Sequence, residues 1–172
     1  MAGLINIGVA KIELGDLAVD GGVATTFAAL GYTEEGSAQL NWEDATETEF
    51  NVEELDSPLY ISTKDGKKSV AFKIANPDED VLVALMGGTK TGTGATAVYK
   101  YPDSVVDIEK SIKITPKKGM GLILTRCKIN AKLSSALGRT ALMGVEVTGT
   151  LLQPTKAGEA PLSTFSCGLI KD

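Results

Sequence analysis

The stretch LILTRCKINAKL, residues 122–133, changes polarity at almost every step and therefore predicts a β-strand. Because successive side chains of a strand point to opposite faces, one face should enter a core while the other is wet and basic. The side chains expected on the core face are Ile123, Thr125, Cys127, Ile129, Ala131 and Leu133. Those expected on the other face, the basic strand face, are Arg126, Lys128, Asn130 and Lys132.

The segments before and after this strand continue the same pattern. Residues 106–114 alternate apolar and polar side chains, and so do residues 143–151 after a Gly138-Arg139 turn, which predicts a long antiparallel hairpin. Further strands are expected near residues 5–14, 37–42, 47–53, 69–74 and 97–101. We therefore predict a mainly β fold, an antiparallel β-sandwich or small barrel.

One short flanking helix is expected at about residues 77–86, within ANPDEDVLVALMGG. Asn76 is the expected N-cap, Pro77 takes the first helical position, and three acidic residues lie in the positively polarised first turn. Gly87 should end the helix. The stretch that follows, GGTKTGTGA (residues 87–95), has the composition of a flexible loop.

Length and composition are those of one ordinary domain. The chain has 172 residues, of which 43% are hydrophobic, so residues 1–172 can bury a sizeable core as a single domain. No apolar run approaches the roughly 18 residues of a membrane span, and the first residues lack a basic region ahead of an apolar one. We expect a soluble protein that is made in the cytoplasm and has no membrane anchor.

No residue pattern points to catalysis, a cofactor or a metal. Histidine is absent, which excludes histidine-based triads, and the two cysteines are too few for a disulfide framework or a metal site. GGTKTGTG lacks the Gly-Lys-Ser/Thr ending of a phosphate-binding loop, and NPDEDV lacks the glycine of a calcium loop. We therefore expect no catalytic, cofactor-binding or metal-binding residues, and Cys127 should be a reduced thiol in the core.

Charge is divided unevenly along the chain. Residues 1–63 carry twelve acidic side chains and one basic one, whereas residues 64–172 carry ten acidic and sixteen basic ones. Nine of the acids lie in residues 31–58, whose large apolar residues argue against a disordered tail. Two interpretations remain open: the two parts neutralise each other within one fold, or an acidic surface on one copy meets a basic surface on another.

The order of these segments resembles the tail tube, or major tail, proteins of long-tailed bacteriophages. The similarity runs from about residue 5 to residue 154: an N-terminal β arm, GYTEEG (residues 31–36) leading into the acidic segment, the strand KKSVAFKI, the short helix, a Gly/Thr loop, and closing strands that end in GVEVTGTLLQP. The resemblance implies one tail-tube-like domain, related to the type VI secretion tube protein, with residues 155–172 as a C-terminal extension of uncertain role.

The resemblance also implies a function. Such a protein would be a structural component of the virion tail without enzymatic activity, made in the host cytoplasm. It would bind copies of itself in hexameric rings that stack into a tube, bind other tail proteins, and meet DNA only as passing cargo.

The acidic segment is then the expected site of self-assembly. It would either line the tube lumen, where it would repel DNA phosphates, or form a loop that reaches the next ring. Its apolar residues favour the loop because they need a surface to bury against. The basic strand face, or lysine residues near it, is the expected partner on a neighbouring copy. The residues assigned to assembly are Glu43, Asp44, Glu47, Glu49, Phe50, Glu53, Glu54, Leu55, Arg126, Lys128 and Lys132.

A second function class is a surface-exposed or carbohydrate-binding β-sandwich module. That class would need an export signal and usually an aromatic platform, whereas aromatic residues make up only 5% of the chain. A dedicated nucleic-acid binder conflicts with the net charge of −5. An enzyme would have only scattered carboxylates as its support.

Overall fold

The computed structural model describes residues 5–134 and 142–167 and is built mainly of β-strands. In chain order the strands are β1 (Ile7–Asp16), β2 (Ala28–Ala29), β3 (Gln39–Trp42), β4 (Thr46–Phe50), β5 (Tyr60–Lys64), β6 (Lys68–Ile74), β7 (Thr89–Thr91), β8 (Val98–Lys100), β9 (Ile108–Leu133), β10 (Val145–Leu151) and β11 (Leu162–Cys167). One α-helix, α1 (Glu79–Met86), lies between β6 and β7.

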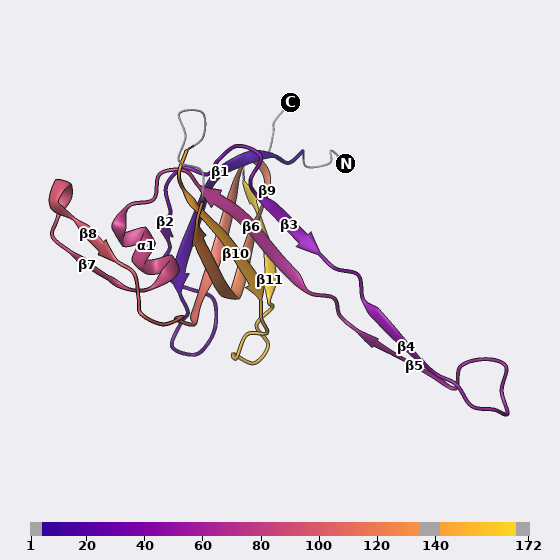
Figure 1. The fold of residues 1–172 in the computed structure, drawn as a ribbon. Coiled ribbons are helices and arrows are strands. Elements are labelled where there is room, and N and C mark those ends of the chain that lie inside the picture. Colours follow the sequence, from indigo (N-terminus) through magenta and orange to yellow (C-terminus); the bar gives the residue numbers. More distant parts are fainter. Residues whose placement is uncertain (1–4, 135–141, 168–172) are drawn as a thin grey trace.

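The body is one curled antiparallel sheet with α1 at its side (Figure 1). Its strand order is β2-β1-β9-β10-β6-β3, and β11 also pairs with β9. The ladders β4-β5 and β7-β8 are separate from this sheet. The predicted fold class, mainly antiparallel β with one short helix, is confirmed.

β9 organises the sheet because it folds back on itself. A straight strand of its 26 residues would span about 85 Å. Instead, the Ser111 hydroxyl in its first half donates to the Thr125 carbonyl oxygen in its second half at 2.6 Å. The first half pairs with β1, and the second half pairs with β11 and then with β10. The change of partner falls at Gly119, whose φ of 107° is accessible mainly to glycine.

The hydrophobic core corrects one detail of the predicted alternation. Within residues 122–133 of β9, the side chains that belong to this core or pack against it are Leu122, Leu124, Cys127, Ile129 and Ala131. The step from residue 124 to residue 127 breaks the period of two, because Thr125 is held by hydrogen bonds to the carbonyl oxygens of Ala160 and Pro161. The core position predicted for Ile123 was therefore wrong. The core position predicted for Leu133 was also wrong, because this residue ends β9 and is 45% exposed.

The predicted hairpin of the closing strands is confirmed. β9 and β10 pair from Leu133 opposite Val145 to Cys127 opposite Leu151. The Gly138-Arg139 turn lies outside the described residues, and β10 begins two residues after the predicted start at Met143. The predictions near residues 5–14, 37–42, 69–74 and 97–101 correspond to β1, β3, β6 and β8, while β4 ends earlier than predicted and β9 begins later.

The helix is also found where it was predicted, but its cap differs. Asp78 is the N-cap, since its carboxylate accepts a hydrogen bond from the Val81 N–H at 2.8 Å. The predicted cap, Asn76, instead accepts from the Tyr32 N–H at 2.7 Å and so ties the helix approach to the segment before β3. Gly87 ends the helix as expected, with φ of 74°.

The Gly/Thr segment forms part of a hairpin that projects from the body. β7 and β8 pair, and a 3-10 turn, η1 (Gly94–Thr96), lies at the tip (Figure 1). The Tyr99 hydroxyl fixes the base by donating to the Gly87 carbonyl oxygen at 2.8 Å, and burial raises the pKa of this phenol. The prediction of a flexible loop was wrong for residues 89–91, which form β7. The Thr residues of β7 and Val98 of β8 favour strand pairing.

Part of the C-terminal extension joins the main sheet. β11 places Phe165 opposite Gly121 of β9. A Cβ at residue 121 would lie 2.3 Å from the Phe165 ring, so the ring covers the space that a side chain would fill. The division into one domain and an extension remains a prediction.

Candidate assembly surface

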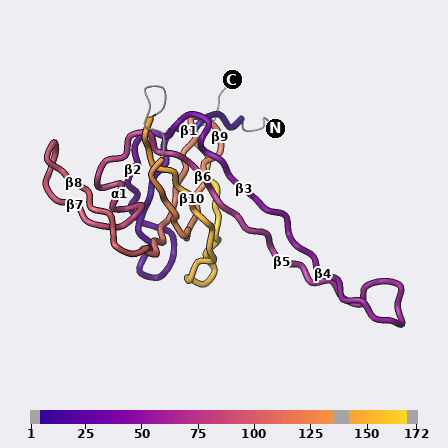
Figure 2. Tube along the Cα trace, in the orientation of Figure 1, coloured from indigo at the N-terminus to yellow at the C-terminus, as the bar shows by residue number. Residues whose placement is uncertain are grey.

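A hairpin arm, residues 43–67, extends far from the body (Figures 1 and 2). β3 and β6 pair at the margin of the sheet, and the same two chain segments pair again farther out as β4 and β5. Gly66 lies at the interruption between the two ladders, where a Cβ would be 2.0 Å from the Glu43 carbonyl oxygen. Only glycine therefore allows the two backbones to approach this closely at the base of the arm.

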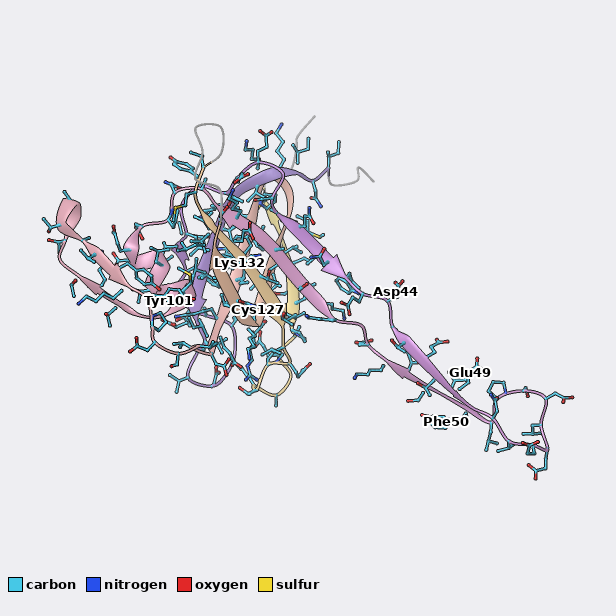
Figure 3. The ribbon with its side chains drawn as sticks, viewed as in Figure 1. Asp44, Glu49, Phe50, Tyr101, Cys127 and Lys132 are labelled. Atoms are coloured by element: carbon cyan, nitrogen blue, oxygen red, sulfur yellow. The ribbon has the colours of Figure 1, made fainter. Side chains whose placement is uncertain are left out.

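The two faces of the arm differ in chemistry. Residues directly opposite each other in an antiparallel ladder share a face. Phe50 lies opposite Tyr60 with ring centroids 6.1 Å apart, and Glu49 lies opposite Ile61 on the other face. Figure 3 shows Asp44, Glu49 and Phe50 clear of the body. The arm thus presents an aromatic face and an acidic face to its surroundings.

Large apolar side chains are exposed along the arm and its base. Phe50 is 52% exposed and Leu55 is 49% exposed, and a cluster of this kind marks an interaction surface more often than scattered single residues do. Of these residues, only Phe50 and Leu55 were assigned to assembly from the sequence. Three more apolar residues, at positions 59–61, could have been added by pairing that segment with the strand predicted at residues 47–53. The full set is Leu40, Trp42, Phe50, Leu55, Leu59, Tyr60 and Ile61.

The acidic side chains of the arm make few ion pairs. Asp65 pairs with Lys68 at the base, at 3.7 Å. The other seven acids of the arm have no ion-pair partner among the residues that the structure describes. They are Glu43, Asp44, Glu47, Glu49, Glu53, Glu54 and Asp56. The arm therefore carries negative charge that the body of the same subunit does not neutralise.

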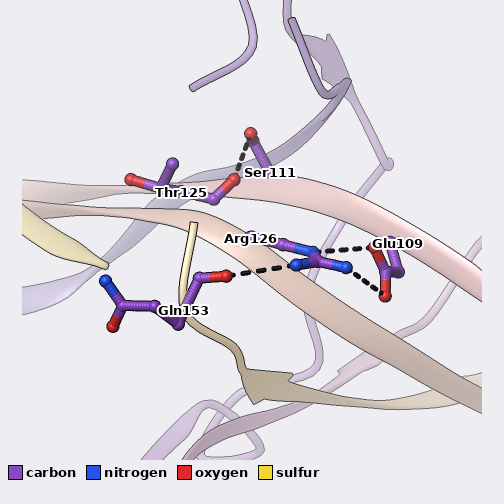
Figure 4. A network of polar contacts seen from close by, with 5 residues as sticks. All are labelled: Glu109, Ser111, Thr125, Arg126 and Gln153. Carbon is purple, nitrogen blue, oxygen red and sulfur yellow. Dashed lines mark hydrogen bonds and ion pairs between the residues drawn. The ribbon is translucent and has the colours of Figure 1, made fainter. Parts of the chain in front are cut away.

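The basic strand face, by contrast, is neutralised within the chain. Arg126 donates to Glu109 twice, from Nε at 2.8 Å and from Nη2 at 3.0 Å, and its Nη1 donates to the Gln153 carbonyl oxygen at 3.2 Å (Figure 4). Lys128 pairs with Asp107 at 2.9 Å. These hydrogen bonds raise the pKa of both Arg126 and Lys128. Each cation already has a carboxylate partner in its own subunit.

The third residue of that face behaves in the same way. Lys132 pairs with Glu146 at 3.1 Å, and Figure 3 shows it on the body, remote from Glu49. The structure thus brings Arg126, Lys128 and Lys132 together on one strand but does not bring them to the acidic segment. Contact between the two surfaces could occur only between copies, and it remains a prediction.

Both interpretations of the uneven charge describe part of the molecule. Three acids of the N-terminal part pair with bases that follow them in the chain, which is neutralisation within one fold. The pairs are Asp16 with Lys110, Asp20 with Lys156, and Glu34 with Lys73. This neutralisation ends at the body, because seven of the eight acids of the arm make no ion pair within the described residues.

A cavity of about 700 Å³ lies beside α1, between the helix, the end of β1 and residues 17–30. Its charged groups are already engaged: Asp78 caps α1, Asp80 pairs with Lys90 at 2.6 Å, and Asp16 pairs with Lys110. Within residues 5–134 and 142–167, no cluster of three or more acidic or cysteine side chains could hold a metal ion. No helix of this part is long and apolar enough to cross a membrane.

One family model matches most of the chain. The family model described as "Phage tail tube protein" matches residues 16–165, which include the helix, both projecting hairpins and most of the sheet, though only the last residue of β1. No curated protein matches the chain. The chain therefore belongs to the phage tail tube protein family, a structural family of the virion tail whose members assemble with one another and with other tail proteins.

Proposed function

We propose that the chain assembles into hexameric rings, that the rings stack into the tail tube, and that DNA passes through its lumen. In this arrangement the arm reaches out of its own ring and docks on a subunit of the next ring. The observation that carries the proposal is the arm itself, which exposes seven large apolar side chains at its base and along its length.

Burial of these apolar groups supplies the driving force. Phe50 and Leu55 would each contribute roughly 1.5–3 kcal/mol if a neighbour covered them fully. Exposed ion pairs contribute only about 0–1 kcal/mol each, so the acids of the arm act mainly on the rate and orientation of docking. The apolar contacts hold the tube together, and the charges select the surface on which the arm lands.

The same charges suit a tube that conducts DNA. The subunit has a net charge of −5, and a negative lumen would repel DNA phosphates and reduce adhesion during transit. DNA is then a passing cargo without a binding site of its own.

The assembly residues proposed on the arm are those assigned from the sequence together with the exposed residues beside them. Arg126, Lys128 and Lys132 are a second proposed landing surface. Each of them would then contact a carboxylate of the arm in addition to the carboxylate that it pairs with in its own chain. The proposed arm residues are Glu43, Asp44, Glu47, Glu49, Phe50, Glu53, Glu54, Leu55, Leu59, Tyr60 and Ile61.

Electron microscopy of the concentrated protein tests the proposal. The parent should form rings and tubes, and the variant Phe50→Ser/Leu55→Ser should remain as free subunits because it lacks the apolar contacts. The matched control is Val19→Ser/Val105→Ser, which changes two apolar side chains that are almost fully exposed away from the arm. Tubes of normal length from the arm variant would show that the arm is not the contact.

A further inference from the structure

A second surface of the subunit carries positive charge that the described residues do not neutralise. Lys117 and Lys118 lie in the bend of β9, and both are exposed without a carboxylate oxygen within 4.0 Å in the described chain. Beside them Ile5 is 60% exposed, Ile7 is 55% exposed and Met120 is 38% exposed. We call these five residues the bend patch.

The bend patch has a fixed shape. The Asn6 side-chain oxygen accepts from the Met120 N–H at 2.6 Å, and Ile7 lies opposite Lys118 in the ladder between β1 and β9. Gly119 lies so close to β1 that a Cβ there would be 2.0 Å from the Asn6 side-chain oxygen. A partner would therefore meet a pre-organised surface, which lowers the entropy cost of docking.

The other bases of β9 are already engaged. Residues 110–134 contain seven basic side chains and no acidic one. Four of the seven form ion pairs: Lys110, Arg126, Lys128 and Lys132. Lys113 lies over the rings of Phe27 and Phe165, at 5.6 Å and 5.3 Å from their centroids. Lys117 and Lys118 are the two that remain.

We infer that the bend patch of one subunit is the landing surface for the arm of a neighbouring subunit. This inference rests on the proposed assembly into a tube and names the surface that the arm meets. The acidic face of the arm, which carries Glu47, Glu49 and the exposed Ile61, matches the bend patch in kind, because each combines exposed apolar surface with charge of one sign, acidic on the arm and basic on the bend.

The contact must join two copies. In Figure 1 the arm leaves the body in one direction, whereas the N-terminal end of β1, which pairs with the bend, lies at another margin of the body. Because the arm and the bend patch are different surfaces, each subunit offers one of each and the contact is head to tail. Contacts of this type propagate, as stacking of rings requires.

Charge reversal tests the inference. The variant Lys117→Glu/Lys118→Glu should raise the protein concentration needed for tube growth by at least about tenfold, because acids would then face acids. Adding Glu47→Lys/Glu49→Lys to the same chain should restore growth, since the arm face that carries these two positions would then be basic and every bend patch acidic. Circular dichroism of each free subunit checks that the sheet is intact.

The matched control changes the same amount of charge on the other candidate surface. Lys128→Glu/Lys132→Glu should raise the protein concentration needed for tube growth less than the bend variant does, because both lysines are already paired with carboxylates of their own chain. If this control fails to assemble while the bend variant forms tubes like the parent, the landing surface is the basic strand face and the inference is wrong. If the parent itself forms no tubes, the proposed function fails, and the inference fails with it.

Cross-linking of the unaltered protein gives a result that does not depend on any variant. A carbodiimide joins a carboxylate directly to an amine that it contacts. In tubes grown from equal amounts of normal and nitrogen-15-labelled protein, cross-linked peptides should join the arm to Lys117 or Lys118. Peptides with one normal and one labelled chain should be among them, which shows that the link joins two copies. Arm peptides joined to Lys128 or Lys132 instead would overturn the inference.

Discussion

Cys127 illustrates at the residue scale how burial alone sets the chemistry of a side chain. Its thiol is fully buried in the core, and its Cβ lies 3.6 Å from where a Cβ on Gly149 would be. Desolvation raises its pKa to about 12, because the thiolate would lose hydration without gaining a partner. The predicted place of Cys127 in the core is confirmed, and the thiol behaves as a small apolar group.

Protein stability should therefore fall at high pH in a way that depends on Cys127. The unfolded thiol loses its proton near its ordinary pKa of 9.0, whereas the folded thiol keeps it to about pH 12. Between these values the unfolded state binds fewer protons, so the free energy of unfolding should decrease by up to about 1.4 kcal/mol per pH unit. Urea unfolding at several pH values should show this decrease for the parent and for Cys167→Ala, and a smaller one for Cys127→Ala. Parallel curves for all three proteins would contradict it.

Single residues also show where sequence reasoning stops. Cys127 and Ile129 were placed correctly because strict alternation survives around them. Asn76 was mistaken for the helix cap because Asn and Asp cap equally well, and only the fold reveals that the Tyr32 N–H competes for its side chain. Ile123 was misplaced because the slip at Thr125 depends on residues 160–161, which are remote in the chain.

At the scale of elements, the arm was only half predictable. Its first strand alternates Glu and Thr and ends in Phe50, which gives a clear strand signal. Its partner β5 was missed because Tyr60 and Ile61 are adjacent apolar residues, and because the connecting loop lacks the short Gly-containing turn of a hairpin. The residues proposed for assembly were chosen in part from the concentration of acids, whereas the projection of the arm depends on the close approach at Gly66.

The base of the arm should control assembly without controlling folding. In Gly66→Ala, the new Cβ would collide with the Glu43 carbonyl oxygen, so the arm must change its direction. We expect tube yield to drop several-fold while the free energy of unfolding of the body changes by less than about 1 kcal/mol, since the core is untouched. Sedimentation and urea unfolding measure the two quantities, with Lys67→Ala as the neighbouring control. Unchanged tube yield would show that the arm tolerates a different exit.

At the scale of the whole molecule, the subunit combines a packed body with two hairpins that project from it (Figure 2). The body has a core, whereas the β4-β5 ladder has every residue of β4 exposed. An isolated two-stranded hairpin is marginally stable in water, and the unpaired acids of the arm repel one another. The arm is therefore expected to gain its order from a neighbouring subunit.

Hydrogen exchange should show this gain of order directly. Amides of residues 43–58 should exchange fast in the free subunit and slowly in the tube, while amides of β9 and β10 should be protected in both. The cost of ordering the arm is met only on docking, which would keep free subunits from polymerising before an initiating complex offers a template. Strong protection of residues 43–58 in the free subunit would show that the arm is stable alone.

The pairing of β9 with β1 also determines when the protein can fold during its synthesis. Asp16 pairs with Lys110, 94 positions later, so the first strand leaves the ribosome long before its partner exists. At about 5–20 residues per second, β1 waits roughly 5–20 seconds. The synthesis of residues 1–63, which carry twelve acids and one base, is completed during that interval. Neighbouring nascent chains on one messenger RNA therefore repel each other while their apolar strands are still unpaired, which opposes aggregation during synthesis.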